Sequence, residues 1–167
     1  MKDAVGSTML VYIVVIVVGI VGSILIASNM YTSAYKAKNN IVSSIDRYYM
    51  VNGNTNCFGD DGDCTNNITD TLKNMGYHYK TSCNNIPKKV LSNANLDDEG
   101  NSAGYPKVSS VYTNSGNSGY CLYKTELSES DYYYTVVTFS HLNINILGIG
   151  SLFSTPVYGE TRTFYNG

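Results

Sequence analysis

Residues 9–27 read MLVYIVVIVVGIVGSILIA, and this uninterrupted apolar run decides the architecture of the chain. It carries no charged residue, and thirteen of its nineteen positions are Val, Ile or Leu. At 1.5 Å per residue, a helix of this length spans about 28 Å, close to the roughly 30 Å hydrocarbon core of a bilayer. Because backbone groups in lipid must bond to one another, the run is expected to be helical despite its many β-branched residues. We therefore predict a transmembrane helix over residues 9–28, after a short N-terminal tail of residues 1–8.

Two alternatives to a membrane span remain open. A cleaved secretory signal also places an apolar run near the start of a chain, but that run usually has only about 7–15 residues. The nearest cleavage-like sequence is Ala27-Ser28-Asn29, which fits the small-residue pattern poorly. The second alternative is a helix buried in a soluble core, which the length of the run disfavours.

Small residues recur on one face of the predicted span. Gly19, Ser23 and Ala27 follow one another at intervals of four residues. This spacing lets two helices approach closely in lipid, although small residues are also common in spans that pack against nothing. We predict that these three residues form the face through which the span packs against another helix.

The apolar pattern continues beyond the span with a helical period. Residues 29–50 read NMYTSAYKAKNNIVSSIDRYYM, and no Pro occurs before Pro87. Its apolar positions are three or four residues apart, which places them on one stripe of a helix, and Gly53 supplies a stop signal. One helix is therefore expected from about residue 8 to about residue 50, with an extramembrane continuation over 29–50. Its stripe, which would support the head or a neighbouring subunit, comprises Met30, Ala34, Ala37, Ile41, Ile45 and Tyr48.

The rest of the chain, residues 51–167, is expected to form a β-rich head, which makes the fold class α+β. A short helix is predicted over 67–75, with Gly76 as its terminator. Alternating apolar and polar residues between turn signals then predict a series of antiparallel strands. These strands are expected over 107–113, 119–126, 132–140, 142–146 and 157–165.

Four cysteines lie in the head, and they permit three pairings. Cys57 and Cys64 enclose only six residues and are expected to close a small loop. Cys83 and Cys121 would then tie a loop region to the sheet. A zinc site is not expected, because the chain has no CxxC pair and only two histidines.

Several functional classes find no support in the composition. Charged residues are 14% of the chain and the net charge is −2, so the chain has no strong basic field and nucleic acid is not expected as a partner. The motifs of serine hydrolases, zinc proteases and P-loop proteins are missing, so we expect no enzyme, no catalytic residues and no cofactor. Two acidic loops, at 60–63 and 97–99, lack EF-hand spacing, and whether either binds calcium stays open.

The orientation of the span rests on two opposing signals. Lys2 lies before the span, whereas Lys36 and Lys38 follow it, and this count slightly favours a cytoplasmic C-terminus. The four cysteines, the low charge and the abundance of Tyr and Asn favour an exported domain instead. Weighing composition more heavily, we predict a single-pass protein of the cell membrane with an extracellular C-terminal domain.

Several stretches of this layout resemble type IV pilin-like proteins, and in particular the TadE-like (tight adherence) minor pilins and pseudopilins of Gram-positive bacteria. The resemblance covers most of the chain, and it lies in the order of tail, apolar helix, helical continuation and β-rich head. The stretches that carry it are Gly6-Ser7-Thr8, Tyr35–Val42, GYCLY at 119–123, YYYTVVTF at 132–139 and GETRTF at 159–164.

The resemblance implies a role in assembly or at the cell surface. Type IV pilins carry a Glu five residues after the Gly at which they are processed, and if Gly6 is that residue the position is Val11 here. A minor pilin or assembly component, in contact with the bilayer and with other pilin-like helices, is therefore expected rather than a major subunit. The alternative is a monomeric, membrane-anchored binding module that uses Tyr132, Tyr133 and Tyr134 as a contact patch, although in a sheet at least one of three consecutive Tyr residues points to the core.

Overall fold

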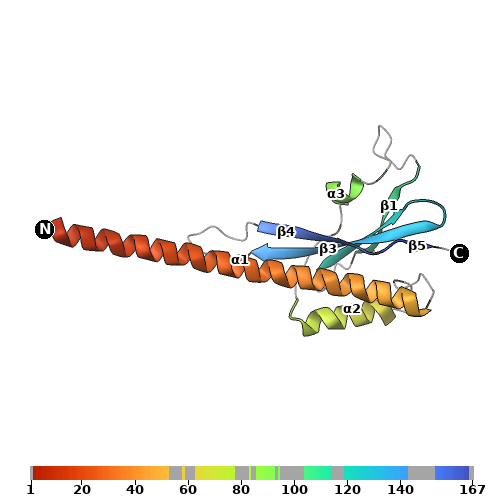
Figure 1. The fold of residues 1–167 in the computed structure, drawn as a ribbon, viewed down its shortest axis with the longest axis horizontal. Helices are drawn as coiled ribbons and strands as arrows, with labels where there is room; N and C mark the ends of the chain where they lie inside the picture. Colours follow the sequence, from red (N-terminus) through yellow and green to blue (C-terminus); the bar gives the residue numbers. More distant parts are fainter. Residues whose placement is uncertain are drawn as a thin grey trace.

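The computed structural model describes residues 2–52, 58, 63–77, 83, 86–92, 94, 104–113, 119–142 and 153–165. A long N-terminal helix is followed by a head built on an antiparallel sheet, which confirms the α+β architecture expected from the sequence (Figure 1). The elements in the described parts are α1 (Lys2–Asn52), α2 (Asp63–Asn74), α3 (Lys88–Leu91), β1 (Lys107–Thr113), β2 (Tyr120–Glu126), β3 (Asp131–Leu142), β4 (Phe153–Glu160) and β5 (Phe164–Tyr165).

Helix α1 is longer than the sequence pattern predicts. It begins at Lys2, six residues before the expected start, so the predicted N-terminal tail is itself helical over its described residues. The physical reason is that no Pro interrupts this part of the chain, and a single Gly inside a helix is tolerated. The N-terminal half of α1 projects away from the head, while its C-terminal half lies along the sheet (Figure 1).

The sheet has the strand order β1-β2-β3-β4, and β5 pairs with β3 beyond the end of β4. All described pairings are antiparallel. Strands β1, β2 and β3 lie within two residues of their predicted bounds. Strand β4 starts at Phe153, four residues earlier than predicted, and the chain then leaves the sheet before β5. Most of the strand predicted over 142–146 lies outside the described residues.

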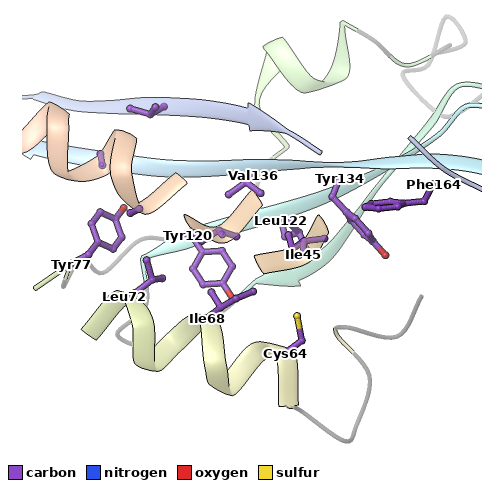
Figure 2. Close-up of a cluster of buried hydrophobic side chains, with 14 of the residues drawn as sticks. Ile45, Cys64, Ile68, Leu72, Tyr77, Tyr120, Leu122, Tyr134, Val136 and Phe164 are labelled. Atoms are coloured by element: carbon purple, nitrogen blue, oxygen red, sulfur yellow. The ribbon is translucent and has the colours of Figure 1, made fainter. Parts of the chain in front are cut away.

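One face of the sheet packs against α1 and α2. Ile45 of α1, Leu122 of β2 and Val136 of β3 belong to a single buried cluster. Figure 2 shows Ile68 and Leu72 of α2 beside Tyr120, while Cys64 points into the cluster below Ile45. These three residues of α2 recur every four positions, which explains why a helix with many polar residues buries one stripe.

Helix α2 begins at Asp63, four residues earlier than predicted, and ends at Asn74, one residue before the predicted end, with Gly76 just beyond it as the predicted terminator. Gly76 adopts a φ of +71°, which glycine tolerates without strain. The amide of Gly76 donates to the carbonyl of Lys73 at 2.9 Å, and the amide of Tyr77 donates to that of Leu72 at 3.0 Å. These bonds form a Schellman motif that satisfies the last helical carbonyls.

The opposite face of the sheet carries a second, smaller cluster. Tyr123 and Val137 point from β2 and β3 to this face and are buried beneath Val90 of α3. The sheet therefore has α1 and α2 on one side and the α3 segment on the other (Figure 1).

Candidate functional site

The N-terminal half of α1 exposes apolar side chains in all directions. Every large apolar residue from Met9 to Ile26 is between 46% and 68% exposed. A soluble helix places such residues on one stripe only, because exposed apolar surface of this extent is unfavourable in water. The helix is long and apolar enough over this part to cross a membrane. This part of α1 is therefore a candidate membrane span.

The three small residues predicted to pack against another helix lie on this free part of α1. Gly19 is exposed, and a methyl group added to it would meet no atom within 4 Å. The hydroxyl of Ser23 donates to the carbonyl of Gly19 at 2.8 Å, so its donor is satisfied within the helix. Ala27 is half-buried. Nothing in the described head covers Gly19, which leaves close approach by another helix sterically open.

The predicted stripe beyond the span lies against the sheet. Ala34, Ala37, Ile41 and Ile45 are each at most 1% exposed, and they form the centre of the larger cluster. Met30 and Tyr48, at the two ends of the stripe, are half-buried. The two alanines permit close contact with the strands. The stripe thus packs against the head of the same chain.

A buried hydrogen bond fixes the position of the sheet along α1. The hydroxyl of Thr138 in β3 donates to the carbonyl of Ala34 at 2.9 Å, and Thr138 is fully buried. Nearby, the aliphatic part of the Lys38 side chain crosses β4 over Gly159, where a β-carbon would come within contact distance of its chain. Its ammonium group lies 4.2 Å from the centre of the Tyr35 ring.

At its C-terminal end, α1 is held by an aromatic cluster. The Tyr49 hydroxyl donates to the carbonyl of Tyr165 at 2.8 Å, and its ring centre lies 4.0 Å from that of Phe164. Tyr132 and Tyr134 flank Phe164 and are 3% and 5% exposed. Burial raises the pKa of Tyr134 to about 12.

The same cluster shows that the Tyr patch considered from the sequence is wrong. In a strand, alternate side chains face the same side, so Tyr132 and Tyr134 both point into the core. Only Tyr133 points to the other face, where it is half-buried. The three residues therefore do not form one exposed contact surface.

Asp46 of α1 carries a carboxylate that the head partly covers. Its Oδ1 atom is buried and accepts no hydrogen bond from the described residues. Arg162 lies close by but donates to the backbone carbonyl of Asp46, at 3.4 Å. Burial raises the pKa of Asp46, and the positive charge of Arg162 opposes this effect only in part.

This environment predicts that the ionised Asp46 side chain lowers the free energy of unfolding, and that the effect depends on pH. The pKa of the Asp46 carboxyl is higher in the folded state than in the unfolded state, so the folded state binds more protons between these two pKa values. The free energy of unfolding therefore falls as the pH rises through this interval. Asp46→Asn should raise the free energy of unfolding at neutral pH, on the order of 0.5 kcal/mol because solvent screens the group. Denaturant titrations at neutral pH and near pH 3 test this, since the gain should vanish at the lower pH. An equal gain at both values would contradict it.

Disulfide bonds involve both the sheet and helix α2. Cys83 and Cys121 form the predicted bond, with their Cα atoms 5.7 Å apart, and both residues are buried. It attaches the segment before α3 to β2. Cys64, in the first turn of α2, is also disulfide-bonded. Its predicted partner, Cys57, lies outside the described residues.

Several residues that hold the head together were not identified from the sequence. Tyr77 is 1% exposed, and its hydroxyl lies within hydrogen-bonding distance of Gly119 and of Phe139 in β3. Thr138 and Thr161 bond through side chains to other elements. Their signal in the sequence is a hydroxyl residue among apolar neighbours, which is too common to be diagnostic.

In the described ranges, no three His, Cys, Asp or Glu side chains cluster closely enough to hold a metal ion. Most of both acidic loops lies outside those ranges. Neither a family model, nor a curated protein, nor a solved structure matches the chain.

Proposed function

We propose that this protein is a single-pass, membrane-anchored surface protein of pilin-like type. It would act as a minor pilin, pseudopilin or assembly component of a type IV (Tad-like) pilus or secretion system, with its head outside the cell. One observation carries the proposal: a single helix is exposed and apolar over its first half and is the core of the head over its second. A separate anchor and head would need a linker, whereas α1 continues without a break.

Two features of α1 support an assembling role. Its buried stripe is used by its own head, so contacts with other subunits must come from the span or from the outer surface of the head. The span offers Gly19, over which another helix has room to pack. Together with the resemblance in sequence, this favours lateral association of helices in the bilayer.

Shear fractionation of intact cells tests the proposal. The sheared filaments, the membrane and the cytosol are blotted for the head, and intact cells are treated with protease in parallel. Recovery of the protein with sheared filaments supports a filament component, and recovery in the membrane with loss of the head to protease supports an assembly component. A head that protease cannot reach on intact cells would overturn the surface location.

Substitutions in the span predict a specific loss of assembly. Gly19→Leu with Ser23→Leu adds bulk to the small-residue face, so crosslinked oligomers in membranes should fall about tenfold, equivalent to about 1.4 kcal/mol of association. Gly22→Leu is the matched control, because Gly22 also has open space around it but lies about 100° around the helix from the centre of that face. Equal crosslinking in all variants would contradict a packing role for this face.

The alternative, a monomeric binding module, gains no observation in its favour. Its predicted contact patch depended on Tyr132 and Tyr134, which lie in the core.

A further inference from the structure

The sheet and the helix run side by side in opposite directions, and two contacts give their relative register. At one end the carbonyl of Ala34 is bonded to Thr138 of β3, and at the other Tyr49 is bonded to Tyr165, which pairs with Asp131 of β3. The helix covers about 23 Å between its two contacts at 1.5 Å per residue. The strand covers about 23 Å between its own at roughly 3.3 Å per residue. The two distances agree, so α1 and β3 lie nearly antiparallel, and a position on one can be matched to a level on the other.

Strand β3 continues past this link toward the N-terminus of α1. It extends four residues beyond Thr138, to Leu142, which pairs with Phe153 of β4. Four strand residues cover about 13 Å, the length of roughly nine helical residues, so this pair is level with about residue 25 of α1. Figure 1 shows the tip of β3 and the start of β4 beside α1 on the side of its N-terminus. This end of the sheet thus reaches the level of the apolar span.

The parts of α1 and of the sheet that lie at the level of the apolar span also lack charged residues. On α1 no charged residue occurs from Ala4 to Tyr35, and on the β side none occurs from Leu142 to Gly159. Ser154, Thr155 and Pro156, at the start of β4, are exposed but uncharged. An exposed surface without charge beside an apolar helix is suited to the region of lipid headgroups and upper acyl chains.

Lysines lie just beyond this uncharged zone. Lys36 and Lys38 follow Ala34 on α1, and Lys89 of α3 lies 4.7 Å from the ring of Tyr158, which pairs with Val137. Lys36 and Lys89 are exposed. Cations at this level would face the phosphates of anionic lipids, which attract Lys side chains near the membrane surface.

We propose that the start of β4, together with the end of β3, is a second membrane contact. The head is seated on the lipid surface beside the emerging helix, with Ser154 at the level where the span ends. The partner is the bilayer itself. This inference rests on the proposed membrane anchoring, and the test below separates the two.

Tryptophan scanning provides the test, because the chain contains no Trp and one introduced residue is the only indole. Ser154→Trp and Thr155→Trp report on the proposed contact, and Ser130→Trp, in the exposed turn between β2 and β3 at the far end of the sheet, is the matched control. Each full-length variant is reconstituted in vesicles of phosphatidylcholine and phosphatidylglycerol, with and without lipids brominated on the acyl chains. Thermal unfolding of each variant confirms that the head is folded.

We expect the emission of Ser154→Trp or Thr155→Trp to shift to shorter wavelength in vesicles and to lose most of its intensity with brominated lipid, while Ser130→Trp changes little. If folded Ser154→Trp and Thr155→Trp both behave like Ser130→Trp, the second contact is overturned. Val17→Trp, within the span, reads the anchoring separately. If only Val17→Trp is quenched, the anchoring proposal stands and the proposed contact at β4 is rejected. If Val17→Trp is not quenched, both the anchoring proposal and the proposed contact are rejected.

Discussion

Ile41→Asp is expected to unfold the head while leaving the apolar span unchanged. Ile41 is 1% exposed and lies one helical turn from Ala37 and Ile45 in the cluster that joins α1 to the sheet. A carboxylate there would be buried without a partner, which costs several kcal/mol beyond the lost apolar contact. Domains of this size are stable by only about 5–15 kcal/mol, so most of the folded state should be lost. Limited proteolysis of membranes should then remove the head and leave a protected fragment of the span.

Ile41→Ala and Ser43→Asp make this prediction specific. Ile41→Ala should lower the free energy of unfolding by about 2–5 kcal/mol, as is usual when a buried aliphatic side chain is truncated. Ser43 is exposed on the other side of the same helix, so Ser43→Asp introduces the same charge without burying it. Resistance to protease should be close to that of the unmodified protein in this variant. If Ile41→Asp were equally resistant, α1 would not be the centre of the head.

Removal of the Cys83–Cys121 disulfide should produce the second largest effect. The bond closes a loop with a sequence separation of 38 residues. In the chain-entropy description, a loop of this length contributes about 4 kcal/mol by restricting the unfolded chain. The double variant Cys83→Ala with Cys121→Ala avoids a free thiol and should lower the free energy of unfolding by about 2–4 kcal/mol. Denaturant unfolding under oxidising conditions measures the difference.

Reduction of the unmodified protein is the companion experiment. Because Cys64 is also disulfide-bonded, a reductant should destabilise the unmodified protein by more than the double substitution does. The double variant should still respond to reductant through the remaining bond. A change of less than about 1 kcal/mol on substitution would mean that core packing alone fixes the segment before α3 to β2.

The parts of the fold that follow from the sequence are those with a clear period. The stripe from Ala34 to Ile45 repeats every three or four residues, and in the structure it lies in the core. The alternation in the strands placed β1, β2 and β3 within two residues of their bounds. In each case the spacing of apolar residues in the sequence reflects one continuous buried face of the element. Burial can therefore be predicted without knowing which other element packs against that face.

Other elements depend on contacts that no local pattern records. Pro156 indicates a break in the chain, yet it lies within β4, whose only described partner strand is β3, and such an edge strand tolerates a residue without an amide hydrogen. The predicted last strand is divided at Thr161, because its hydroxyl accepts the hydrogen bond of the Tyr134 amide in place of a backbone carbonyl. Helix α2 starts early because Cys64 is held in the core. These three outcomes are decided by tertiary partners.

The continuity of α1 also has a mechanical consequence. A helix without a Pro or a flexible linker is stiff, so if α1 spans a bilayer as proposed, the head must follow any tilt of the span. Between Ala27 and Asn52 the helix extends about 38 Å, and a tilt of about 20°, which is ordinary in bilayers, moves its far end sideways by roughly 13 Å. Bilayer thickness, which sets the tilt, would thereby set the direction in which the outer surface of the head is presented.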